Sequence, residues 1–159
     1  MRQVDALVIH CADTPNGKPF TARHIDRWHA ARVDKRELAE RAEADLRYNP
    51  SFPYIAYHDI ICVDGAVQPG RGENEVSSAN APLNQTSISV CLIGMDKFTR
   101  AQWEALKIYV EDAERRYGAL QVLGHRDISR TLKTCPSFDV AAWRLAGMQP
   151  VVTALLVDQ

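Results

Sequence analysis

Three side chains that could bind a transition metal stand at the ends of predicted elements or in a loop. His10 closes an apolar run near the start of the chain, His125 follows the run LQVLG, and Cys135 lies ten residues later in KTCPSFD. Two strand ends and one loop can meet at a single edge of a sheet. Two imidazoles and one thiolate are typical zinc ligands, and a set of three leaves the fourth tetrahedral position for water, as in catalytic sites.

Spacing alone leaves a simpler alternative open. A histidine at a strand end is more often a hydrogen-bonded edge residue, and a single cysteine is usually a small buried apolar group. The chain has four cysteines, far apart and without a CxxC pair: Cys11, Cys62, Cys91 and Cys135. The first three lie in or beside apolar runs and are predicted to be reduced thiols that pack in the core. Cys135 differs, because Lys133, Thr134 and Pro136 surround it in a loop where a metal or a cation could hold the thiolate.

Length and composition describe a single globular domain over residues 1–159. Of the 159 residues, 46% are hydrophobic and 25% charged, and 19 Lys and Arg against 20 Asp and Glu give a net charge of −1. Domains that bind nucleic acid or anionic lipid usually carry a basic excess, so we expect neither partner. No run approaches the roughly 20 apolar residues of a membrane span, and the start is too weak for a secretory signal. We therefore expect synthesis in the cytoplasm, and a monomer as the default for a small single domain.

Periodicity and turn residues predict the elements that must position the candidate ligands. ALVIH, residues 6–10, is a buried strand that ends in the turn-rich segment CADTPNG. Thr21 offers an N-cap for a helix, and residues 34–48, DKRELAERAEADLRY, have high helix propensity. The segment YIAYHDIICVDGAVQPGR is predicted to form two antiparallel strands around Asp64-Gly65.

The second half of the chain adds the centre of the predicted sheet. SISVCLIG is nearly continuous in apolar residues, which is typical of a strand covered on both faces. Thr99 and Gln102 form a capping box for a helix that Gly118 closes. LQVLGH is another short strand that ends in a loop, VAAWRLAGM is a short helix, and residues 148–159 form a C-terminal tail. The order of elements predicts an α/β fold, a central mixed β-sheet with helices packed on its faces.

Several of these strings together resemble one known family. They are VIHCADT near the start, AYHDIICVDGAVQPGR in the middle, TSISVCLIG after a polar loop, and LGHRDISRTLKTCPSFDVAAW near the end. In this order, from about residue 4 to about residue 145, they resemble the zinc-dependent N-acetylmuramoyl-L-alanine amidases. That family includes phage lysozyme-type endolysins and the peptidoglycan recognition proteins.

The resemblance implies a fold, a metal, a substrate and a set of site residues. It implies that zinc lies in a surface groove with His10, His125 and Cys135 as ligands, and that Tyr57 and Lys133 are the catalytic side chains. The expected reaction is hydrolysis of the amide between the lactyl group of N-acetylmuramic acid and the L-alanine of the stem peptide, which degrades the bacterial cell wall. An amide is a poor electrophile, so its hydrolysis needs an activated water and positive charge near the developing oxyanion.

Other residues are expected to border the substrate groove. His58 and Arg71 are predicted to contact the wall peptide, whose carboxylates an arginine can bind with two hydrogen bonds. Family members commonly carry a histidine in the loop before the SIG-type strand; here Asn80 could replace it, and Asn84 could border the groove. Asp127 or a backbone carbonyl could orient a ligand imidazole.

One segment departs from the family pattern. Residues 33–53 are predicted to be a helical insertion that forms one wall of the groove, with a solvated surface helix as the alternative.

These expectations leave three functions to compare. The first is a phage or prophage endolysin, a bacteriolytic hydrolase that reaches peptidoglycan after the membrane is breached. The others are a cytoplasmic amidase that recycles wall fragments and a non-catalytic peptidoglycan-binding module. Non-catalytic relatives typically lose the cysteine ligand, whereas this chain keeps Cys135, Tyr57 and Lys133 together.

Overall fold

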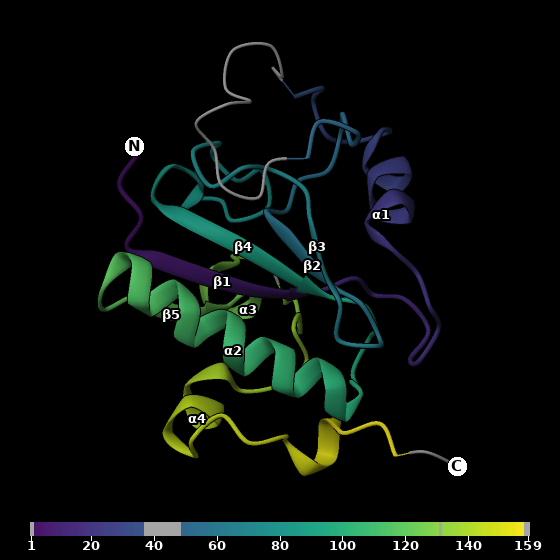
Figure 1. Cartoon of the computed structure of the whole chain (residues 1–159), viewed down its shortest axis with the longest axis vertical. Coiled ribbons are helices and arrows are strands. Elements are labelled where there is room, and N and C mark those ends of the chain that lie inside the picture. The colour runs from purple at the N-terminus through teal and green to yellow at the C-terminus, as the bar shows by residue number, and fades with distance from the viewer. Residues whose placement is uncertain (1, 37–48, 131, 158–159) are drawn as a thin grey trace.

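A five-stranded mixed sheet forms the centre of the molecule (Figure 1). The computed structural model describes residues 2–36, 49–130 and 132–157. Its elements in chain order are β1 (Ala6–Cys11), α1 (Ala22–His29), β2 (Asp59–Ile61), β3 (Val67–Pro69), β4 (Ser87–Leu92), α2 (Arg100–Tyr117), β5 (Gln121–Gly124), α3 (His125–Ile128) and α4 (Val140–Leu145). Two single turns of 3-10 helix occupy Asn84–Thr86 and Val152–Ala154.

The strands follow the order β3-β2-β4-β1-β5 across the sheet. β1 is parallel to both β4 and β5, β2 is parallel to β4, and only β3 runs antiparallel, paired with β2. Every residue of β1 and β4 is buried, as expected for parallel strands covered on both faces. The predicted mixed α/β architecture is therefore confirmed, and the carboxyl ends of β1, β4 and β5 share one edge of the sheet.

Two apolar clusters cover the two faces of the sheet. Alternate side chains of β1 and β4 pack with α2, α4 and the C-terminal turn, in a cluster that includes Trp103 and Trp143. Side chains from the opposite face, such as Cys91 and Ile60, pack with Ile25 of α1. In Figure 1, α2 runs along one side of the sheet, and α1 lies far from α2, on the side of β2 and β3.

The longest helix begins and ends where its sequence predicts. The backbone N–H of Gln102 donates to Thr99 Oγ1 at 3.1 Å, and the N–H of Thr99 donates to Gln102 Oε1 at 2.9 Å, which completes the capping box. Gly118 ends the helix with a φ of 81°, a conformation that glycine adopts without steric cost. One face of α2 is buried, with Trp103, Leu106, Val110 and Ala113 among its buried residues.

Among the shorter elements, the β2–β3 hairpin, α1 and α4 agree with the predictions from sequence, whereas α3 was not predicted. The hairpin β2–β3 turns at Gly65, whose φ is 85° and where a Cβ atom would lie 2.9 Å from the carbonyl oxygen of Ala101. α1 begins after Thr21, and α4 lies within the predicted final helix. The segment after β5, predicted as a loop, starts with the helical turn α3. Most of the predicted helix over residues 34–48, and with it most of the 33–53 insertion, lies outside the described residues.

The segment after α4 docks onto the body of the domain. The N–H of Phe98 donates to the carbonyl of Ala154 at 2.9 Å, and the N–H of Leu156 donates to the carbonyl of Phe98 at 2.8 Å. Phe98 itself is fully buried. None of the described helices is long and apolar enough to cross a membrane.

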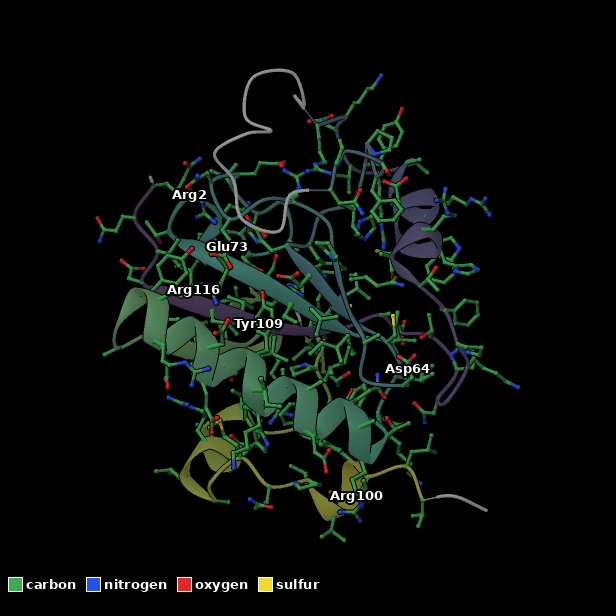
Figure 2. The ribbon with its side chains drawn as sticks, viewed as in Figure 1. Arg2, Asp64, Glu73, Arg100, Tyr109 and Arg116 are labelled. Atoms are coloured by element: carbon green, nitrogen blue, oxygen red, sulfur yellow. The ribbon has the colours of Figure 1, made fainter. Side chains whose placement is uncertain are left out.

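Charged side chains from distant parts of the chain fix the polar loop between β3 and β4. The Arg2 guanidinium donates to three carbonyl groups at both ends of this loop, those of Glu73, Gln85 and Ser87. The carboxylate of Glu73 accepts from Arg116 and from the hydroxyl of Tyr117, at the end of α2. Figure 2 shows Glu73 between Arg2 and Arg116.

A buried ion pair holds the middle of the same loop. Arg36 forms a salt bridge at 2.5 Å with Glu75 and also donates to the carbonyl of Gly70 at 3.2 Å. Both charged side chains are almost fully buried. A buried pair of this kind is costly to break because either partner alone would be left as an uncompensated charge. The loop is therefore a fixed part of the fold.

Candidate metal centre and active-site groove

The register of the parallel strands brings the two candidate histidine ligands together. Ile9 in β1 pairs with Gly124 in β5, so the next residues, His10 and His125, lie side by side at the carboxyl edge of the sheet. Their ring centroids are 4.6 Å apart. The backbone N–H of Cys11 donates to Cys135 Sγ at 3.1 Å, which fixes the thiol beside the end of β1. One ligand atom from each of His10, His125 and Cys135 lies within 4.8 Å of the others.

The electrostatics of this triad fit a transition metal. Burial lowers the pKa of His10 to about 3, and burial followed by the charge of Lys133 lowers the pKa of His125. Both rings are therefore neutral near pH 7, the form that binds metals. The neighbouring Cys11 and then burial raise the pKa of the Cys135 thiol. A bound cation reverses this effect by stabilising the thiolate, and two imidazoles with one thiolate are a donor set suited to zinc.

Tyr57 and Lys133, the predicted catalytic residues, both border the triad. The Tyr57 ring centroid is 5.1 Å from that of His10. Burial raises the pKa of Tyr57 well above its ordinary value, so its hydroxyl keeps its proton and can donate a hydrogen bond. Lys133 is exposed and lies in the loop that leads to Cys135.

Two adjoining cavities form a groove across the triad. One has a volume of about 530 Å³ and includes Asp13, Asp96 and Cys135 in its lining. The other has a volume of about 360 Å³ and includes His29 and Ser78. Both cavities are lined by a shared set of five residues: His10, Arg32, Tyr57, His125 and Lys133. The triad therefore lies where the two halves of the groove meet.

Two residues of this groove were not predicted from the sequence as site residues. Nδ1 of His29 accepts from the N–H of Ala56 at 3.0 Å, and its ring lies 5.3 Å from that of Tyr57. Burial and then the charge of Arg32 lower the pKa of His29 to about 4. Arg32, just beyond α1, is exposed in both cavities. His29 lies one helical turn after the buried Ile25 and so on the same face of α1, and this spacing could have indicated that its side chain points inward.

The structure places Asn80 behind the metal centre, away from the groove surface. Asn80 is fully buried, and its Oδ1 lies 2.6 Å from Nε2 of His10. Asn84 Oδ1 accepts from the backbone N–H of Asn80 at 2.8 Å. Asp127 accepts from the N–H of Gly124 at 2.7 Å and so caps α3. Asn80 therefore makes the hydrogen-bond contact with a ligand imidazole that was expected of Asp127 or a backbone carbonyl.

His58 and Arg71, both expected to contact the wall peptide, are buried, and neither lines the two cavities of the groove. Nδ1 of His58 accepts from the N–H of Ser89 at 3.0 Å, and Nε2 lies 2.8 Å from the carbonyl oxygen of Glu75. Arg71 Nε donates to the carbonyl of Ile55 at 2.8 Å. These hydrogen bonds hold the segments around β2, and Arg71 also lines a separate cavity of about 270 Å³.

The buried His58 predicts a specific pH dependence of stability. Burial lowers its pKa from 6.5 to about 3, so the unfolded chain binds a proton below pH 6.5 that the folded chain does not. The stability present above pH 6.5 is lost as the pH falls, by up to about 1.4 kcal/mol per pH unit for this one group. Urea unfolding between pH 7 and pH 4 should therefore show a shallower loss of stability for His58→Gln than for the native chain. Parallel pH curves for the two proteins would contradict this assignment.

Comparison with known proteins gives consistent matches along the chain. A family model described as N-acetylmuramoyl-L-alanine amidase matches residues 1–138. The endolysin of Escherichia phage T7 is 31% identical over 147 residues, which cover 87% of this chain and 84% of that protein. The endolysin of Klebsiella phage KP32 is 29% identical over 150 residues, which cover 89% and 86%.

Solved structures share the fold. The N-acetylmuramoyl-L-alanine amidase LysC from Clostridium intestinale URNW superimposes with a TM-score of 0.70 at 21% identity, over 92% of this chain and 85% of that chain. The Drosophila peptidoglycan recognition protein PGRP-LB superimposes with a TM-score of 0.67 at 20% identity, over 96% and 86%. At these identities the structural matches show the architecture alone.

Proposed function

The chain belongs to the N-acetylmuramoyl-L-alanine amidase family, and we propose that it is a zinc-dependent hydrolase of peptidoglycan. The bond cleaved is the amide between the lactyl group of N-acetylmuramic acid and the L-alanine of the stem peptide. The observation that carries the zinc assignment is the convergence of His10, His125 and Cys135, whose ligand atoms lie within 4.8 Å of one another.

The triad, Tyr57 and Lys133 each have a chemical task in this reaction. A zinc ion held by the triad would supply a water that is nucleophilic near neutral pH and a positive charge beside the scissile carbonyl. The Lys133 ammonium stabilises the negative charge that develops on the carbonyl oxygen. The Tyr57 hydroxyl donates a hydrogen bond at the same centre. Tyr57 and Lys133 are the two candidates for delivering a proton to the leaving amine of L-alanine.

The charges of the two cavities suggest how the substrate lies in the groove. The described residues lining the smaller cavity include the cations Arg32 and Lys133 and no carboxylate. The larger cavity adds the acidic side chains of Asp13 and Asp96. We place the carboxylate-bearing stem peptide in the smaller cavity and the uncharged sugar in the larger one, with the scissile amide between them at the triad.

Removal of the metal tests the proposal directly. We expect the purified protein to contain about one zinc per chain and to release the amino group of L-alanine from purified cell wall. Dialysis against a strong chelator should abolish this release, because the bound zinc is the group proposed to make water nucleophilic near pH 7. Addition of zinc should restore it. Undiminished amino-group release by protein shown to be metal-free by mass spectrometry would contradict the proposal.

The setting proposed for this activity is that of an endolysin, the name carried by the phage relatives. In this setting the protein is made in the cytoplasm and reaches the wall once the membrane is breached. A recycling amidase would instead act on soluble wall fragments. Rates on intact wall and on soluble muropeptide, measured side by side, distinguish the two, and faster hydrolysis of intact wall is expected.

A further inference from the structure

Asn80 is a buried amide in contact with a proposed zinc ligand, and its hydrogen bonds define the protonation of that ligand. We propose that Asn80 is a positioning residue that holds His10 in the tautomer protonated on Nε2, so that the Nδ1 lone pair faces the metal. This inference rests on the zinc site proposed above and adds a residue to it. Asn80 was expected at the surface as a substrate contact, whereas it is 0% exposed.

The orientation of the Asn80 amide follows from its partners. The carbonyl oxygen of Ile88 lies 3.2 Å from Nδ2 of Asn80 and can only accept a hydrogen bond. The hydroxyl of Ser87 donates to the carbonyl of Leu83 at 2.6 Å, so its oxygen is available to accept from Nδ2 at 2.8 Å. Both contacts require the NH₂ group on this side of the amide. Oδ1 is therefore the atom that faces His10.

The tautomer of His10 follows in turn. Oδ1 has no proton to give, so at 2.6 Å it must accept one from Nε2 of the imidazole. The ring is buried, and an imidazole that binds a metal is neutral and carries a single N–H. Nδ1 is then the unprotonated nitrogen, the only one able to coordinate a metal. Metal-binding histidines generally need such an acceptor on their second nitrogen, and loss of the acceptor typically lowers metal affinity about 10- to 100-fold.

The loop around Asn80 is built to keep this amide in place. The backbone N–H of Asn80 donates to Oδ1 of Asn84 at 2.8 Å, and its carbonyl accepts from the N–H of Leu83 at 2.6 Å. The amide is thus fixed by its backbone and by its own NH₂ group. The Asn80 side chain therefore has little rotational freedom, and its Oδ1 is held in a fixed position as a hydrogen-bond acceptor.

Zinc affinity tests the role of Asn80 without reference to catalysis. The zinc dissociation constant would be measured by competition with a chromophoric chelator for the native chain and for Asn80→Ala, Asn80→Asp and Ser77→Ala. We expect Asn80→Ala to raise the constant about 10- to 100-fold, and Asn80→Asp, which keeps an acceptor for Nε2–H, to stay near the native value or below it. Ser77→Ala is the matched control, because Ser77 is buried in the same loop and its hydroxyl donates a hydrogen bond to Ser89, not to His10.

Nitrogen NMR of the imidazoles provides the second measurement. In metal-free native protein at neutral pH, the His10 spectrum should show a proton on Nε2, and this preference should weaken in Asn80→Ala. A proton on Nδ1 in the native protein, or a folded Asn80→Ala that binds zinc within about threefold of the native chain, would overturn the inference. The tautomer is measured on metal-free protein and does not depend on zinc binding. If the protein bound no zinc and did not hydrolyse cell wall, the proposed function would be refuted, but the NMR measurement would still show which His10 nitrogen carries the proton.

Discussion

Replacement of Cys135 by alanine is expected to give a folded chain that does not retain zinc and releases amino groups from cell wall more than about a hundredfold more slowly. A loss of this size exceeds the roughly 10- to 100-fold cost of removing an indirect partner, because a direct ligand is lost. The two remaining imidazoles, His10 and His125, would bind zinc weakly and without the charge-neutralising thiolate. Zinc content by mass spectrometry and wall hydrolysis on the same preparation measure the effect.

The other cysteines provide the control for this substitution. Cys62 is buried at the end of β2 and outside the triad, and burial raises the pKa of its thiol to about 11. Cys62→Ala should therefore reproduce the loss of a buried thiol while the zinc content and the rate of hydrolysis stay close to native. Full activity in Cys135→Ala, or equal loss of zinc in both variants, would exclude Cys135 as a ligand.

Replacement of Lys133 by methionine should lower kcat about 100- to 1,000-fold while zinc content stays at about one per chain. This range is typical for removal of a single group that stabilises a developing oxyanion. Lys133 is exposed, and methionine keeps most of the length of its side chain, so the fold should tolerate the change. Steady-state kinetics on a soluble muropeptide separate kcat from KM, and a group that acts mainly in the transition state should change kcat more.

Substitution of Lys107 on α2 is the matched control for substitution of Lys133. It is paired with Glu111 on the surface of the helix and lies outside both cavities of the groove. Lys107→Met should therefore leave kcat unchanged. If Lys133→Met kept native kcat and raised only KM, the ammonium would be a binding group for the stem peptide, and its proposed role at the oxyanion would be wrong.

Strong local patterns made the scaffold of the site predictable. The apolar runs of β1 and β4 and the capping box of α2 each specify their element with residues that lie next to one another in sequence. The convergence of His10 and His125 could also be predicted, since parallel strands place their carboxyl ends at one edge. The short turn α3 was missed because four residues are too few to show a helical period.

Burial within the polar loop could not be predicted from the loop itself. Its sequence, GENEVSSANAPLNQT, is typical of solvent-exposed turns, and this favoured a surface role for Asn80. The buried position of this loop depends on Arg2, Arg36 and Arg116, which come from remote parts of the chain. Such contacts between distant positions carry no local sequence signal, so the loop appeared to be at the surface.

The placement of short strands at both margins of the sheet has a consequence for self-association. Among the described strands, the two longest, β1 and β4, are flanked on both sides, and the margins are formed by β3, with three residues, and β5, with four. β3 also ends at Pro69, which has no backbone N–H to donate. Long unpaired strands are the usual template on which another chain adds a strand and aggregation begins. This topology offers little such template, so we expect the protein to resist strand exchange between copies when it is concentrated.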